Sequence, residues 1–103
     1  MRFLVKVNMS VESGNEAAKA GKLGATAQSI LAEQKPEAAY FTTDNGQRTA
    51  FLFIEMRDAS QIPAIAEPWF LAFNAGIEIR PVMVAADLAK AEPAIAAAAK
   101  KYR

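Results

Sequence analysis

The sequence predicts an α+β fold, with helices packed on one face of an antiparallel sheet of four strands and one more helix at the C-terminus. Three observations support this prediction. Apolar residues alternate with polar ones in several short segments, which is typical of half-buried strands. Longer segments with helical spacing of apolar residues separate the strands. An Asn-Gly pair, which is typical of a hairpin turn, stands between two of the predicted strands. The order β-α-β-β-α-β followed by a helix is that of a ferredoxin-like sandwich.

The first third of the chain predicts a strand and then a helix. The strand has apolar residues at alternate positions, namely Phe3, Val5, Val7 and Met9. A helix is expected over residues 14–34, with Ser10 or Ser13 as its N-terminal cap. Gly21 and Gly24 weaken this helix, and they either allow close backbone packing or mark a break near residue 21.

A β-hairpin is predicted in the middle of the chain. Its strands are expected over residues 38–43 and 48–56. Asp44-Asn45-Gly46 is a strong turn signal, because Asn and Gly readily adopt the positive φ angles of tight hairpin turns. After the hairpin, Asp58 or Ser60 is expected to cap the next helix, with Gln61 placed for a capping box from Asp58.

The last third predicts an interrupted helix, a strand and a final helix. Pro68 lacks an N–H, so the helix that begins near residue 62 is expected to kink or restart there. Gly76 is expected to close this helix in the left-handed conformation. A strand is expected over residues 77–84, and Glu92-Pro93 is expected to open the last helix.

Composition bounds the number of domains and excludes several kinds of chemistry. The chain has 103 residues, which predicts a single domain over residues 1–103. A net charge of +1 with interleaved signs predicts no nucleic-acid partner. No apolar run has membrane-spanning length, so we expect no membrane partner and a cytoplasmic location. Cys and His are absent, which excludes zinc motifs, His-ligated haem and Ser-His-Asp catalysis, and no metal or cofactor is predicted.

Strand parity separates the two faces of the expected sheet. The face under the helices is predicted to be apolar throughout: Phe3, Val5, Val7, Leu52, Ile54, Ile77 and Ile79. The other face, called the open face, mixes apolar and charged residues: Leu4, Lys6, Asn8, Phe51, Phe53, Glu55, Glu78, Arg80 and Val82. Because an exposed apolar patch with a polar rim usually marks an interface, a two-fold homodimer through this sheet face is predicted.

Three segments carry a family resemblance: PEAAYF (36–41), EPWFLAFNA (67–75) and EIRPVMVAADLAKA (78–91). Together with the order of strands and helices, they resemble the dimeric α/β-barrel superfamily, and within it an uncharacterised, muconolactone-isomerase-like bacterial branch. The superfamily also includes cofactor-free quinone-forming monooxygenases. The resemblance implies a dimeric α/β barrel, and isomerase-like or oxygenase-like proton transfer.

The charged residues of the open face form the first candidate site. Lys6, Glu55, Glu78 and Arg80 are expected on neighbouring strands, where opposite charges attract. In the functional interpretation, Arg80 or Lys6 holds an anionic or enolisable ligand while Glu55 or Glu78 moves a proton, and Glu55 with Arg80 is the preferred catalytic pair. In the structural interpretation, the same charges form an interfacial ion-pair network that fixes the dimer register.

The helix around the proline forms a second candidate site. Glu67 and Trp69 would bind a ligand in a crevice against the sheet, or Trp69 belongs to the core and Glu67 acts as a cap. Tyr40 either donates a hydrogen bond to a ligand or is a half-buried sheet tyrosine whose hydroxyl meets water. Arg48 is expected in solvent or paired with Asp44.

Two functions from different classes remain open at this point. One is a small-molecule enzyme that acts by proton transfer, and the other is a non-catalytic module that binds a metabolite or only assembles. An enzyme needs an open cavity with a carboxylate whose pKa is raised by desolvation. A structural module needs a filled interface in which the charges of the first candidate site are fully paired.

Overall fold

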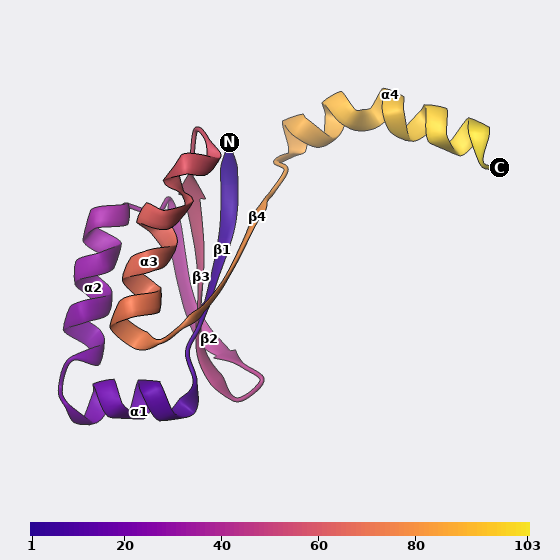
Figure 1. Cartoon of the computed structure of the whole chain (residues 1–103). Coiled ribbons are helices and arrows are strands. Elements are labelled where there is room, and N and C mark those ends of the chain that lie inside the picture. The colour runs from indigo at the N-terminus through magenta and orange to yellow at the C-terminus, as the bar shows by residue number, and fades with distance from the viewer.

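The structure, a computed structural model, describes residues 1–103 and has the predicted α+β fold (Figure 1). Its elements are β1 (Arg2–Asn8), α1 (Val11–Lys19), α2 (Leu23–Gln34), β2 (Ala38–Asp44), β3 (Gln47–Glu55), the short 3-10 helix η1 (Ala59–Gln61), α3 (Ile62–Phe73), β4 (Gly76–Pro81) and α4 (Ala85–Lys101). The four strands pair antiparallel in one open sheet of order β2-β3-β1-β4. This is a ferredoxin-like order with an added C-terminal helix.

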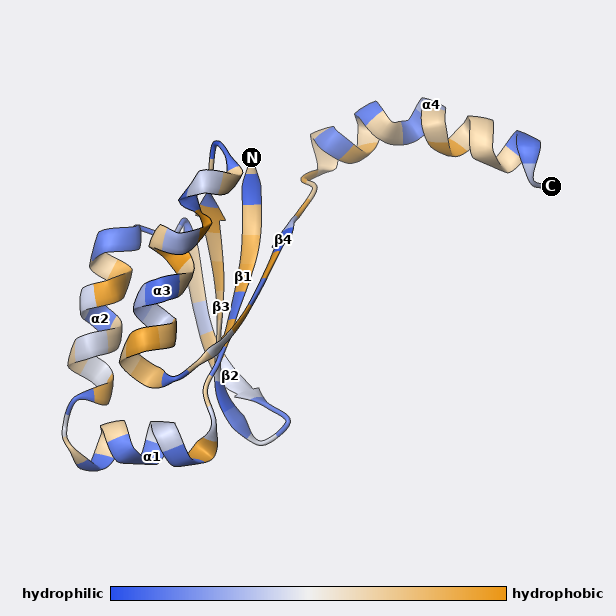
Figure 2. Ribbon diagram, in the orientation of Figure 1, coloured by the Kyte–Doolittle hydropathy of each residue, from blue (hydrophilic) through white to orange (hydrophobic).

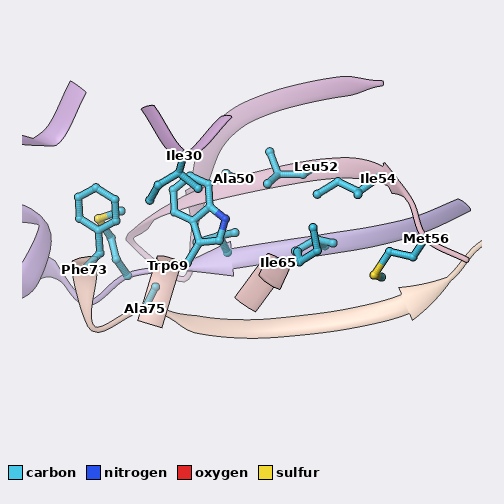
Figure 3. Close-up of a cluster of buried hydrophobic side chains, with 12 residues drawn as sticks. Ile30, Ala50, Leu52, Ile54, Met56, Ile65, Trp69, Phe73 and Ala75 are labelled. Atoms are coloured by element: carbon cyan, nitrogen blue, oxygen red, sulfur yellow. The ribbon is translucent and has the colours of Figure 1, made fainter. Parts of the chain in front are cut away.

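The helix-covered face of the sheet is the apolar one, which confirms the predicted strand parity. Val5 lies opposite Leu52 on β3 and opposite Ile79 on β4, so three strands present one apolar row to the helices. Trp69 and Phe73 of α3 point toward this face, with ring centroids 5.9 Å apart (Figure 3). Burying each large apolar side chain stabilises the fold by roughly 1.5–3 kcal/mol.

The helix expected over residues 14–34 is two helices, and the break lies near residue 21, one of the two alternatives. Gly21 has a φ of +70°, a conformation that favours glycine, and α2 then turns away from α1 (Figure 1). Of the two possible caps, Ser10 is the one used. Its Oγ accepts a hydrogen bond of 3.1 Å from the backbone N–H of Ser13.

The predicted hairpin turn and capping box are both confirmed. Asn45 and Gly46 form a two-residue turn with φ angles of +53° and +73°, the positive values that this turn requires. At the start of η1, the side chain of Asp58 accepts from the backbone, and Gln61 completes the capping box.

Of the two outcomes expected at Pro68, a kink or a restart, the restart is wrong, because α3 runs unbroken through it. A proline at this position leaves the carbonyl of Ala64 without its helical donor. Gln34 of α2 supplies a donor instead: its Nε2 lies 3.4 Å from the Ala64 oxygen and 2.9 Å from the Ile65 oxygen. The Oε1 of the same side chain accepts from the indole Nε1 of Trp69 at 3.1 Å.

The end of α3 and the end of β4 also differ from the prediction. Asn74, with a φ of +52°, closes α3 in the left-handed conformation, and Gly76 instead begins β4. Asn tolerates this conformation because its short polar side chain can bond locally. β4 ends at Pro81 rather than at residue 84, although the backbone N–H of Val82 still donates to the carbonyl of Arg2 at 3.0 Å.

The last helix, α4, begins earlier than predicted and carries Pro93 inside it. The Asp87 carboxylate accepts from the backbone N–H of Val84 at 3.0 Å, which supports an earlier start.

Apolar residues recur along α4 at spacings of four and three: Val84, Leu88, Ala91, Ile95, Ala98 and Tyr102. The helix projects away from the rest of the domain, and none of its residues is buried (Figure 1). Hydrophilic and hydrophobic segments mix along its length (Figure 2). No helix of the chain is both long and apolar enough to cross a bilayer.

Gln34→Met is expected to lower the free energy of unfolding by about 2–3 kcal/mol, because it leaves the indole N–H and a helix carbonyl without partners. Urea unfolding followed by the fluorescence of Trp69, the single tryptophan, measures the loss. Gln28→Met makes the same change at an exposed position of α2 and is expected to cost less than about 0.5 kcal/mol. Equal losses in the two variants would contradict the role of Gln34.

Candidate functional site

The open face of the sheet carries most of the residues predicted to form a site. One row crosses all four strands, with Tyr40 opposite Phe51, Phe51 opposite Lys6, and Lys6 opposite Glu78. Arg80 lies one row further along β4 on the same face. Lys6, Glu78 and Arg80 are therefore neighbours on one surface, two of them on the edge strand.

Lys6 is the centre of a small ion-pair network on this face. Its Nζ lies 2.5 Å from the Asp44 carboxylate and 3.7 Å from that of Glu78, and Arg80 Nη2 lies 4.0 Å from the same Glu78 oxygen. The hydrogen bond to Asp44, followed by attraction to Asp44 and Glu78, raises the pKa of Lys6 above the ordinary lysine value, although partial desolvation opposes the rise. Asp44, which the sequence placed in the turn and named as an alternative partner of Arg48, joins the hairpin to this network.

Three other predicted residues lie apart from the network. Glu55 is two rows away from Lys6, roughly 13 Å along the strand, and its carboxylate pairs with the N-terminal amino group. Tyr40 shares the row of Lys6, but Phe51 stands between them and the tyrosine is 63% exposed. Glu67 is exposed on α3, which packs on the other face of the sheet.

A cavity of about 560 Å³ lies on the helix side, between α2 and the β2–β3 hairpin. Its lining is mainly apolar and comes from five elements and the residue after β1: Val7, Met9, Leu23, Gly24, Ala27, Gln28, Leu31, Phe41, Thr42, Arg48, Thr49, Ala50 and Trp69. A volume of this size is common in small-molecule sites. Trp69 is thus both a core residue, 2% exposed, and part of the cavity wall.

The cavity exists because α2 carries small residues where it crosses the hairpin. Gly24 and Ala27 line the space, and a Cβ added to Gly24 would meet no atom within 4 Å. Leu23 and Leu31 flank these small residues on the same helix. At the rim, Phe41 of the edge strand β2 is 63% exposed although it points to the helix-covered face.

Arg48 stands at the rim of the cavity, and the pairing expected with Asp44 is wrong. The two residues lie on opposite faces of the sheet, and Asp44 is engaged by Lys6. The Nη1 of Arg48 donates to Asn15 Oδ1 at 3.1 Å. The guanidinium also packs on Gly14, where a Cβ would come within 2.5 Å of Nη1. None of the ion pairs of the chain includes Arg48.

The two surfaces offer different chemistry. The open face has paired charges beside half-buried apolar side chains. The cavity has apolar walls with one cation, Arg48, at its rim, and no Asp or Glu belongs to its lining. No group of three or more His, Cys, Asp or Glu side chains is placed to hold a metal ion. The cavity therefore suits a molecule with an apolar body, and the open face suits a charged or protein partner.

Sequence reasoning found the open face and Trp69 but missed the α2 side of the cavity. The available signal was the pair of small residues, Gly24 and Ala27, on the face of α2 that also carries Leu31. Small residues at helical spacing have two opposite structural meanings. They allow close packing of two backbones, or they leave space for something else.

Asp44→Asn is expected to lower the pKa of Lys6, because the contact with the Asp44 carboxylate is the main cause of its elevation. A raised lysine pKa means that the pair stabilises the fold fully below the ordinary lysine value and that this stabilisation is lost as pH rises through the raised one. An NMR titration of the Lys6 side chain measures the change. Glu78→Gln removes the more distant carboxylate, at 3.7 Å, and is expected to lower the pKa less. A larger decrease of the Lys6 pKa in Glu78→Gln than in Asp44→Asn would contradict the geometry.

Comparison with protein families gives a match over most of the chain. A family described as a domain of unknown function, DUF3303, matches residues 1–96. The match includes every strand, α1 to α3 and most of α4, so the projecting helix is part of what defines the domain. No curated protein matches the chain. The chain belongs to the DUF3303 family.

Proposed function

We propose that this member of the DUF3303 family binds a small, largely apolar molecule in the cavity between α2 and the hairpin. The observation that carries the proposal is an apolar space of about 560 Å³ with an exposed phenylalanine, Phe41, at its rim. Water gains few hydrogen bonds in such a space because few polar groups line it. A ligand with a flat or chain-like body would cover Phe41 and contact Trp69 and Leu31, which removes apolar surface from water.

The chemistry of the walls favours binding over catalysis in this cavity. Proton transfer needs an acid or a base within about 3 Å of the reacting atom. The lining holds no Asp, Glu, His, Cys, Tyr or Lys, and its only charged side chain is the guanidinium of Arg48. The cavity is therefore better suited to the metabolite-binding alternative than to an isomerase-like or oxygenase-like reaction.

Titration with simple amphipathic compounds tests the proposal through Trp69 emission. Suitable probes are 4-phenylbutyrate, octanoate and decanoate, each with its matching alcohol. Wild type is expected to show a saturable change with at least one of them. Gly24→Leu is expected to weaken that binding about tenfold or more, because the new side chain occupies the open space beside Gly24. The same change should not harm α2, since leucine is the better helix former.

The control for this experiment fills a different space. Ala25→Leu adds the same side chain to α2 but faces an outer groove between α2 and α3, which also has a volume of about 560 Å³ and includes the exposed Leu71. We expect binding in this variant to match wild type. The absence of saturable binding for every compound would contradict the proposal, and so would a greater loss in Ala25→Leu than in Gly24→Leu.

The alternative is proton transfer on the open face, of the isomerase or cofactor-free oxygenase type. Arg80 or Lys6 would hold an anion, and Glu78 or Glu55 would move the proton. This alternative is supported by the charged groups of Lys6 and Arg80, which both lie within 4.0 Å of the Glu78 carboxylate. Against it, Asp44 already neutralises Lys6, and Glu55 lies two rows away with its own partner.

We also propose that the chain forms a homodimer through the open face. Leu4 lies opposite Phe53 there, beside Phe51, and all three are only half-buried. The face carries both signs of charge, Lys6 and Glu78 among them, so a second copy would not repel it. The apolar stripe of α4 has no partner within the chain, whereas most helices in proteins are stabilised by packing an apolar face against other elements. A second copy would cover both surfaces.

Phe53→Glu is expected to convert a dimer into a monomer, because it places a charge in the middle of the apolar patch. Light scattering on a sizing column measures the mass of the full chain. Ala32→Glu, at an exposed position of α2, adds the same charge away from the open face and is expected to remain dimeric. A monomeric wild type, or a dimer that survives Phe53→Glu, would rule out this interface.

A further inference from the structure

We infer that the ligand of the cavity between α2 and the hairpin is an organic anion, and that Arg48 binds its carboxylate. The inference rests on the proposed function and names the class of molecule that the same site takes. The molecule would have an apolar body of one ring or a short alkyl chain, and one negatively charged end. The argument depends on the position of Arg48, on its free donors and on how the chain holds it.

Arg48 is placed to meet a ligand at the entrance of the cavity. It lies on β3 two residues before Ala50, so its side chain leaves the sheet on the helix-covered face. It is half-buried and belongs to the lining together with Trp69 and Phe41. An apolar body between Trp69 and Phe41 would leave its polar end at the rim, where the guanidinium stands.

The guanidinium has hydrogen-bonding capacity that the protein does not use. Arginine has five N–H donors, and the contact of Nη1 with Asn15 Oδ1, at 3.1 Å, is the one side-chain hydrogen bond that Arg48 makes. No carboxylate lies within 4.0 Å of it, whereas Lys6, Arg2 and Arg80 all have acidic partners. A carboxylate accepts two parallel N–H bonds from a guanidinium, which makes it the natural counterpart of a partly desolvated arginine.

The side chain of Arg48 packs against Gly14 of α1. Gly14 lies inside α1, where glycine weakens a helix relative to alanine. A Cβ at this position would come within 2.5 Å of Nη1 and 3.1 Å of Cδ of Arg48, so a larger residue would displace the side chain. Gly14 leaves space for the guanidinium, and Asn15 Oδ1 accepts a hydrogen bond from it. This arrangement restricts the side chain before any ligand arrives, which lowers the entropic cost of binding.

The test compares each carboxylate with its matching alcohol, using the intact chain and Trp69 emission at pH 7. Wild type is expected to bind 4-phenylbutyrate, octanoate or decanoate about 10 to 100 times more tightly than the matching alcohol, the range of a charge-assisted hydrogen bond. Arg48→Gln is expected to remove this preference, so that the carboxylate and its matching alcohol bind with affinities within about twofold of each other. Lys19→Gln, which removes an exposed cation outside the cavity, is the charge-matched control and is expected to keep the preference.

The outcomes separate this inference from the proposed function. Equal affinity of wild type for a carboxylate and its alcohol would overturn the inference and leave the cavity as a neutral binding site. A preference that survives Arg48→Gln would place the anion elsewhere and also overturn it. Failure of every compound to bind would remove the proposed function, and the inference with it. If Arg48→Gln does not fold, the wild-type comparison of acid and alcohol still decides the question.

Discussion

The side chain of Gln34 fixes the arrangement on which the rest of the domain depends. Its amide donates to the carbonyls near Pro68 and accepts from the indole of Trp69, so it joins the end of α2 to the middle of α3. Because the indole N–H and these carbonyls have partners, α3 continues through a proline and keeps Trp69 against the sheet. The opposite end of α2, near Gly24, is small and open. The C-terminal end of α2 is therefore held against α3, and its N-terminal end borders the cavity.

The β2–β3 hairpin contributes a charged side chain to each face of the sheet. Asp44 just before the turn engages Lys6 on the open face, and Arg48 just after it reaches the cavity on the helix side. The alternation of side chains in the strands separates the two residues, although they are close in the sequence. Assembly through the open face and ligand binding in the cavity would thus use different surfaces. Neither would block the other.

Local sequence patterns predicted most of the fold. Predictions were wrong where a residue distant in the sequence determined the local structure. Strand parity predicted the row of Val5, Leu52 and Ile79 because an alternating strand with one buried face has only one acceptable register. The predicted restart at Pro68 was wrong, and the carbonyl of Ala64, which Pro68 leaves without a helical donor, is bonded by Gln34 on another helix. The cavity could not be predicted because small residues on α2 indicate either close packing or empty space, and only the position of the hairpin decides between them.

Xenon binding followed by NMR tests the central claim, that an apolar cavity lies between α2 and the hairpin. Xenon enters empty apolar cavities without needing polar contacts. Under xenon pressure, the largest amide and indole shifts should occur at Gly24, Ala27 and Trp69, which line the cavity. Shifts confined to Ser29 and Leu71, in the outer groove between α2 and α3, would contradict the account, as would the absence of any localised shift.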